Sequence, residues 1–132
     1  MTVFLDTIGL LAVWDVTDQW HHAATASLAE LQAGGAELIT SGYVLLECGN
    51  AAARRPYRSS VIRLKQGLET EKCLILPTDE DWTVAWNAYV RGEADSAGIV
   101  DQISFAVMRL LEITAAFTND KHFRAAGFET LF

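Results

Sequence analysis

The sequence contains only two cysteines and two prolines among its 132 residues, and its apolar runs are short. Cys48 and Cys73 stand alone without C-x-x-C spacing, so we expect reduced thiols rather than a disulfide framework. No apolar run reaches the roughly 18 residues of a membrane span. The N-terminus also lacks the basic region and cleavage site of a signal peptide. We therefore expect a cytoplasmic protein without a membrane segment.

Several catalytic motifs are missing as well. No P-loop, no G-x-G-x-x-G and no Ser-His-Asp order occurs, so nucleotide-cofactor chemistry and acyl transfer have no support. His21 and His22 lack the partner spacing of a zinc site, and the start of a helix explains them better.

Basic residues are scarce, with 10 Lys and Arg against 17 Asp and Glu and a formal net charge of −7. This balance argues against a general nucleic-acid binder, which is usually basic. Five of the ten basic residues nevertheless fall within twelve positions, namely Arg54, Arg55, Arg58, Arg63 and Lys65. The group could present a local face that attracts phosphate, or it could be the solvated side of a helix. The sequence leaves both interpretations open.

Strands and helices alternate along the chain. Apolar runs predict strands over residues 2–5, 37–40, 73–76, 114–118 and 128–132. Helical periodicity predicts helices over 8–14, 19–32, 42–54, 80–90 and 99–111, with one more after Pro56 and a short one that ends near Gly127. Residues 91–98 are expected to form a polar loop. The alternation predicts a parallel sheet with helices on both faces, in a single domain over residues 1–132.

Helix starts carry capping signals. Thr17 or Asp18 is expected to cap the helix over 19–32. Thr78 and Asp81 have the spacing of a capping box for the helix over 80–90.

Two of the expected strands lead to an aspartate. The run Val3 to Leu5 ends on Asp6, and the run Thr114 to Thr118 leads through Asn119 to Asp120. The carboxyl ends of parallel strands share one edge of an open α/β sheet, where such sheets bind their ligands. If the two strands are neighbours, Asp6 and Asp120 emerge together.

Two more carboxylates lie on apolar helical stretches. Asp101 is in the first turn of the helix over 99–111, on the same side as Phe105 and Met108. Glu47 lies inside YVLLECGN. Ionised acids on buried faces are costly unless they are paired or bind a metal. Too few basic residues are nearby to pair with all of them.

A bound divalent cation would explain how four ionised acids can lie on buried faces without basic partners. Mg²⁺ and Mn²⁺ prefer oxygen ligands. Clustered carboxylates repel one another, so their pKa values should rise without metal. A bound ion can activate water and stabilise charge that develops on a phosphate. The side chains expected to orient the acids are Thr7, Ser104, Thr118 and Asn119.

Each acid also has a purely structural explanation. Asp6 and Asp120 could cap the helices that follow them. Asp101 could be a first-turn acid that favours the helix dipole, and Glu47 could form a salt bridge with Arg54. Without a common site, all four structural explanations would have to be correct at the same time. One shared site accounts for the four acids together and is therefore favoured.

The segments FLDT, LLECGN, GIVDQISFAVM and FTNDKHF, followed by a closing GF-x-x-L, resemble the PIN-domain ribonucleases of the VapC toxin type. The resemblance covers nearly the whole chain in the right order and spacing. It implies an α/β fold, a three-layer α/β/α sandwich around a central parallel sheet of four to five strands, in a single PIN-like domain. It places the acids of the family on Asp6, Glu47, Asp101 and Asp120, with Thr7 or Thr118 and Asn119 as supporting polar groups.

The function implied by the resemblance is hydrolysis of RNA phosphodiesters by metal-activated water, with Mg²⁺ or Mn²⁺ as cofactor. The resemblance also implies a cognate antitoxin that covers the active site, and a homodimer. Many relatives approach the third acid through Ser-Leu-x-Asp, whereas residues 95–100 here read DSAGIV. Asp95 is therefore either an additional ligand or a loop acid.

Other residues have open roles. The candidates for contact with RNA phosphates are Arg54, Arg55, Arg58 and Lys121. His122 could touch substrate, but anchoring of the last helix is the expected role. Trp82, Trp86 and Tyr89 repeat at helical spacing and are expected to form core or a dimer face.

Two competing functions remain. One is a catalytically silent PIN-like interaction module. The other is a receiver-like phosphoacceptor domain, which needs a phosphoacceptor aspartate at the end of a central strand and a lysine at the end of a later strand. Neither the sequence after Ile39 nor the Leu76–Thr78 segment provides that arrangement.

Overall fold

The computed structural model describes residues 1–132 and contains one five-stranded sheet in the order β3-β2-β1-β4-β5. All neighbouring strands are parallel. The strands are β1 (Thr2–Leu5), β2 (Glu37–Ser41), β3 (Leu74–Ile75), β4 (Ala115–Phe117) and β5 (Glu129–Thr130). The predicted parallel sheet is confirmed, although the edge strands β3 and β5 have only two residues each and are shorter than predicted.

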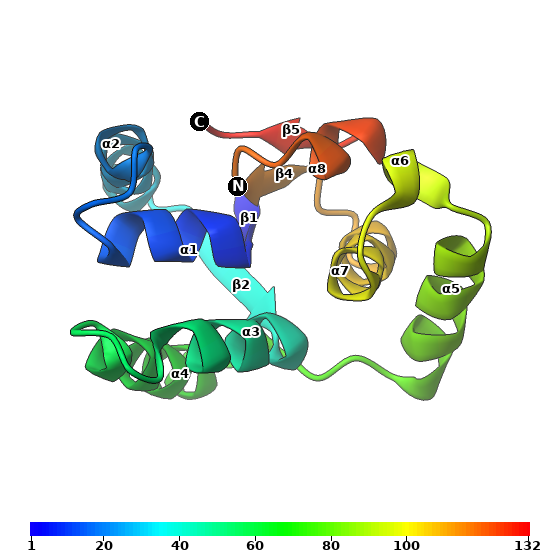
Figure 1. Ribbon diagram of the computed structural model, residues 1–132, viewed down its shortest axis with the longest axis horizontal. Coiled ribbons are helices and arrows are strands. Elements are labelled where there is room, and N and C mark those ends of the chain that lie inside the picture. Colours follow the sequence, from blue (N-terminus) through cyan, green and yellow to red (C-terminus); the bar gives the residue numbers. More distant parts are fainter.

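Eight helices surround the sheet: α1 (Thr7–Trp14), α2 (His21–Ala33), α3 (Gly42–Ala52), α4 (Arg58–Thr70), α5 (Asp79–Val90), α6 (Glu93–Ser96), α7 (Ile99–Leu110) and α8 (Lys121–Ala125). Helices α1 to α4 gather on one side of the sheet, and α5 and α7 lie on the other (Figure 1). The three-layer α/β/α sandwich is therefore confirmed. None of the helices combines the length and hydropathy needed to cross a membrane.

The two central strands set the position of the candidate acids. Both β1 and β4 are almost entirely buried, as expected for continuous apolar runs in a parallel sheet covered on both faces. Leu5 is in register with Phe117. Asp6 and Thr118 therefore leave the sheet side by side.

Helix α1 packs very closely against the end of β4. A Cβ atom built on Gly9 would lie 2.1 Å from the carbonyl oxygen of Phe117. Only glycine fits at this position without moving the helix. The absent side chain thus allows the first turn of α1 to stand directly over the strand that leads to Asp120.

The predicted polar loop over 91–98 contains a short turn, α6, so the prediction was wrong in detail. Ala94, Asp95 and Ser96 have φ values of 54°, 57° and 57°, in the left-handed region. Such a conformation costs roughly 1–2 kcal/mol per non-glycine residue. The turn is held from α7, where buried Gln102 donates its side-chain N–H to the carbonyl oxygen of Glu93 at 2.8 Å.

The helix starts followed the sequence signals unevenly. The Thr78–Asp81 capping box of α5 is present as predicted. Helix α2, however, begins at His21, and its N-cap residue Trp20 makes no side-chain cap bond. Asp18 instead accepts a hydrogen bond from the Trp20 N–H at 2.7 Å, in the turn that precedes the helix.

The aromatic residues of α5 are on the surface. Trp82, Trp86 and Tyr89 are 47%, 37% and 47% exposed, so the expectation that they form core was wrong. Together with Tyr43 of α3 they form an aromatic series with successive ring-centroid distances of 6.2, 5.9 and 5.2 Å. The expectation of a dimer face stays a prediction.

Candidate active site

Asp6 follows β1 directly and is only 2% exposed. It is the N-cap residue of α1, where Oδ2 accepts a hydrogen bond from the Ile8 N–H at 3.4 Å. The same oxygen accepts a hydrogen bond from the Thr118 hydroxyl at 2.8 Å. Burial, then the negative charges of Asp101 and Asp120, raise the pKa of Asp6 to about 7, although the Thr118 and Ile8 hydrogen bonds oppose the rise.

Asp120 lies beside Asp6, in the segment that follows β4. Its backbone N–H donates to the Thr118 hydroxyl oxygen at 3.1 Å. The Thr118 hydroxyl therefore contacts both acidic segments at once. Asp120 also caps α8, because its Oδ1 accepts a hydrogen bond from the His122 N–H at 2.9 Å. The capping explanations of Asp6 and Asp120 are thus correct, but the two acids still converge.

Asp101 comes to the same place from the first turn of α7. No protein group donates a hydrogen bond to its carboxylate. Burial raises its pKa to about 6, with further contributions from the charges of Asp120 and Glu47, whereas His122 lowers it. Asp101 and Asp120 offer ligand atoms within 4.8 Å of each other, and Asp6 is close enough to both for their charges to raise its pKa, so the three carboxylates border a common space.

Glu47 reaches this space from α3. Its Oε1 accepts a hydrogen bond from the Thr7 hydroxyl at 2.6 Å. The salt bridge with Arg54 is not formed; the structure pairs other residues. Glu47 is partly buried, and its charge contributes to the raised pKa of Asp101.

The four residues expected to orient the acids do so unequally. Thr7 and Thr118 donate to Glu47 and Asp6. The buried Ser104 hydroxyl instead donates to the Val100 carbonyl oxygen of its own helix at 3.0 Å, so the expectation for Ser104 was wrong. The side chain of Asn119 makes no hydrogen bond, and its backbone carbonyl oxygen accepts one from Arg124 at 3.3 Å.

His122 is the residue that the sequence undervalued. Its Nδ1 lies 2.7 Å from Oδ1 of Asp120. Asp101, Asp120 and His122 offer ligand atoms that all lie within 4.8 Å of one another. The sequence did contain one signal for this contact. His122 lies two residues after Asp120, the N-cap of α8, which places its ring close to the capping carboxylate.

Of the basic candidates, Lys121 directly follows Asp120, whereas the three arginines lie beyond the end of α3. Arg54 and Arg55 lie in the turn between α3 and α4, Arg58 is the first residue of α4, and all three are exposed. Lys121 forms a salt bridge with Asp95 at 3.6 Å, and both side chains are largely exposed. Asp95 is therefore a paired acid in the α6 turn, outside the group that contains Asp101 and Asp120.

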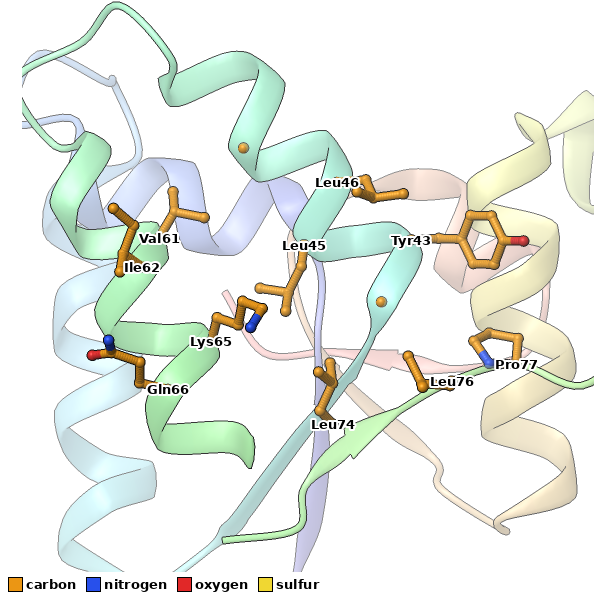
Figure 2. A pocket seen from close by; sticks show the side chains of 12 residues that line it. Tyr43, Leu45, Leu46, Val61, Ile62, Lys65, Gln66, Leu74, Leu76 and Pro77 are labelled. Atoms are coloured by element: carbon orange, nitrogen blue, oxygen red, sulfur yellow. The ribbon is translucent and has the colours of Figure 1, made fainter. Parts of the chain in front are cut away.

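The largest cavity, of about 670 Å³, is on another part of the molecule. It is mostly apolar and lies between α3, α4 and β3, with Leu45, Val61 and Leu74 directed into it (Figure 2). None of the four acids lines it. The acidic cluster lies at the carboxyl edge of the sheet, and this cavity does not belong to it.

The donor set at the sheet edge fits a hard divalent cation. Carboxylate oxygens predominate, as Mg²⁺ and Mn²⁺ prefer, and one imidazole is within reach, which Mn²⁺ also accepts. Burial is the main cause of the raised pKa values of Asp6 and Asp101, and the charges of neighbouring carboxylates raise both values further. A cation among these oxygens would offset the repulsion between the carboxylates.

Comparison with known proteins agrees with this arrangement. Residues 3–129 match the model of the family described as the PIN domain. The structure is similar to that of Mycobacterium tuberculosis VapC20, a toxin that cleaves the sarcin–ricin loop, with a TM-score of 0.76 and 27% sequence identity. The similarity covers 96% of this chain and 95% of the VapC20 chain. A comparison with curated proteins gives no match. The family match covers almost the entire sequence, and the chain belongs to the PIN-domain family.

Proposed function

We propose that this chain is a divalent-metal-dependent endoribonuclease and the toxin of a toxin–antitoxin pair. The observation that carries the proposal is the convergence of Asp6, Glu47, Asp101 and Asp120, two of them with strongly raised pKa values. Membership of the PIN-domain family and similarity to a toxin that cleaves RNA support RNA as the substrate class. The receiver-like alternative loses its support, because the chain belongs to a different family.

The four acids are the proposed metal ligands and the proposed catalytic residues. Bound Mg²⁺ or Mn²⁺ would supply a Lewis acid for the phosphate and lower the pKa of a water molecule. The chain's own contribution is orientation. Thr7 holds Glu47 and Thr118 holds Asp6 by hydrogen bonds to their carboxylates. His122 holds Asp120 through both its backbone N–H and its ring.

Further proposals follow from kinship with VapC toxins. A cognate antitoxin would cover the acids and keep RNA away from them. The chain would act as a homodimer in the cytoplasm, with residues 1–132 as one domain. The exposed aromatic series of Tyr43, Trp82, Trp86 and Tyr89 supports an interface between protein chains, since aromatic residues are enriched at such surfaces.

A catalytically silent interaction module is the second candidate. It is favoured by the net charge of −7, which weakens non-specific attraction to RNA. It differs from the ribonuclease in one respect: it needs no metal and cuts nothing.

The test is a titration of Mg²⁺ and Mn²⁺ with purified protein and a mixed pool of cellular RNA. Wild type should cleave the RNA only with metal. Asp101→Asn should lose roughly a hundredfold or more of the activity, since it removes one of the negative charges proposed to hold the metal. Asp79→Asn, at an exposed position in the first turn of α5, is the matched control and should cleave normally. Metal-dependent cleavage at the wild-type rate by Asp101→Asn would remove Asp101 from the site. No cleavage by wild type with either metal would favour the silent module.

A further inference from the structure

A smaller cavity, lined mainly by polar residues, lies at the far ends of the helices that bring Thr7 and Glu47 to the acids. It has a volume of about 470 Å³ and lies between the turn that follows α1 and the turn that joins α3 to α4. Its lining includes Trp14, Thr17, Arg55, Tyr57, Ser59 and Arg63. It is separate from the acidic cluster, and none of the proposed ligands lines it.

The arginines at this cavity carry more positive charge than the acids of the protein neutralise there. Arg55 and Arg63 line it, and neither forms a salt bridge, nor do the neighbouring Arg54 and Arg58. The Arg63 guanidinium is steadied by the hydroxyl oxygens of Ser59 and Ser60, at 3.2 and 3.1 Å. Four unpaired guanidinium groups in a chain with 17 acids indicate a face kept free for an external anion.

One acid also lines the cavity. Asp15 accepts hydrogen bonds from the Thr17 N–H at 3.0 Å and the Thr17 hydroxyl at 2.6 Å. These bonds, and then the charges of Arg55 and His21, lower its pKa. Its carboxylate is thus committed to its own turn, and the arginines outnumber it. The cavity remains attractive to a phosphate.

The wall of the cavity is aromatic. The rings of Trp14 and Tyr57 are stacked, with a centroid distance of 6.5 Å and an interplanar angle of 29°. A nucleotide offers a planar base for such a wall and a phosphate for the guanidinium groups beside it. An acidic peptide offers charge to the arginines but no flat ring for the wall. The combination therefore favours a nucleic-acid strand over an acidic protein.

The cavity lies within reach of an RNA strand bound at the acids. Trp14, which lines the cavity, follows Thr7 by seven residues within α1, which corresponds to roughly 10 Å along the helix axis. Helices α1 and α3 both lead from the acids toward the cavity, and they pack against each other (Figure 1). A strand that crosses the acids can therefore continue along these helices.

We propose that this cavity is a second subsite for single-stranded RNA, in which Arg55 and Arg63 bind the phosphate backbone and the Trp14–Tyr57 pair receives a base. The inference rests on the proposed function and adds to it where a flanking part of the substrate binds. The subsite would hold nucleotides beside the cleaved bond and would not take part in the chemistry.

Binding can be measured without cleavage. The probe is a fluorescently labelled single-stranded RNA of about 12 nucleotides, followed by anisotropy in EDTA over a series of salt concentrations. Arg55→Gln combined with Arg63→Gln should weaken binding roughly tenfold and reduce the slope of log K against log salt by about 1.4. Tyr57→Leu should weaken binding but leave the slope unchanged, because it removes a stacking surface and no charge. Circular dichroism spectra confirm that each variant is folded.

The matched control is Arg91→Gln. Arg91 is exposed and already paired with Glu93 at 2.6 Å, so its loss should leave RNA binding unchanged. Wild-type affinity and slope in the Arg55/Arg63 double variant would overturn the subsite. So would equal losses in the control, or an oligoglutamate peptide of the same length that competes as well as unlabelled RNA. The last result would identify a surface for an acidic protein.

The same experiment separates this inference from the ribonuclease proposal. Normal RNA binding by the double variant, together with intact metal-dependent cleavage by wild type, would overturn the subsite alone. Impaired binding by the double variant, together with no cleavage by wild type, would support the subsite and overturn the ribonuclease proposal alone.

Discussion

Replacing Asp101 by asparagine should make the metal-free protein more stable near neutral pH. Asp101 is partly buried, accepts no hydrogen bond and faces the charges of Asp120 and Glu47. These surroundings raise its pKa from 3.8 to about 6. An asparagine has nearly the same shape and carries no charge, so it removes the repulsion without leaving a cavity.

The sign and size of the effect follow from linkage. The folded protein holds the Asp101 proton more tightly than the unfolded chain, so its stability falls as pH rises between about 4 and 6. One pH unit of difference between folded and unfolded pKa values corresponds to about 1.4 kcal/mol, so the range from 3.8 to about 6 corresponds to about 3 kcal/mol. The burial of the asparagine amide offsets part of this gain. We expect a net stabilisation of about 1–3 kcal/mol above pH 7.

The measurement is urea unfolding in EDTA at about pH 4 and about pH 8, followed by tryptophan fluorescence. The quantity of interest is the difference in unfolding free energy between Asp101→Asn and wild type. It should be near zero at the lower pH and favour the variant at the higher pH. Asp79→Asn is the control for loss of one exposed charge. Adding Mn²⁺ should then stabilise wild type, by about 2.7 kcal/mol at a concentration of one hundred times Kd, and leave Asp101→Asn nearly unchanged.

Two outcomes would refute this reasoning. One is an Asp101→Asn protein that is less stable than wild type at pH 8 without metal. The other is a stability difference that does not change between the two pH values, because a pH-independent effect cannot arise from the ionisation of Asp101.

Two other substitutions test how the site is built. Gly9→Ala should destabilise the fold by about 1–3 kcal/mol, because the new Cβ would meet the Phe117 carbonyl oxygen. Gly49→Ala, at an exposed position of α3 where a Cβ meets open space, should instead stabilise the fold by about 0.5–1 kcal/mol. Both free energies of unfolding are measured with denaturant, and equal effects of the two substitutions would contradict the role of Gly9. Thr118→Val removes a hydrogen bond that lowers the pKa of Asp6, so Mn²⁺ affinity measured by calorimetry should fall at pH 7 and recover at higher pH. A loss of affinity that is the same at all pH values would argue for a simple packing defect.

The central part of the fold was accessible from the sequence because its signals are strong and local. The runs before Asp6 and Asn119 are continuous apolar segments, and in the structure they pair as β1 and β4 at the buried centre of the sheet. The edge strands were predicted too long. Residues 73–76 and 128–132 are apolar enough to form strands, but each has a neighbour on one side only, so pairing stops after two residues.

The acids could be found from the sequence because each interrupts an apolar pattern. Features that depend on three-dimensional packing could not. Nothing local in residues 93–96 specifies a left-handed turn, which is stabilised by Gln102 from the next helix. The Ser104 hydroxyl had two available acceptors, a distant acid or its own helix backbone, and sequence spacing cannot rank them. The exposure of Trp82 likewise depends on which side of α5 meets α7.

The four acids are not anchored to the same degree. A single hydroxyl, that of Thr118, contacts the carboxylate of Asp6 and the backbone of Asp120, and Thr7, next to Asp6, holds Glu47. These three acids are therefore tied to the ends of β1 and β4, whose register cannot slip without turning their side chains to the opposite face. Asp101 has no such hydrogen bond, and its position depends on the packing of α7 alone. A cation shared with the other acids would thus hold Asp101 in place, which no hydrogen bond of the protein does. It follows that loss of metal should loosen the first turn of α7 before it disturbs the strand ends, an order that amide hydrogen exchange can resolve.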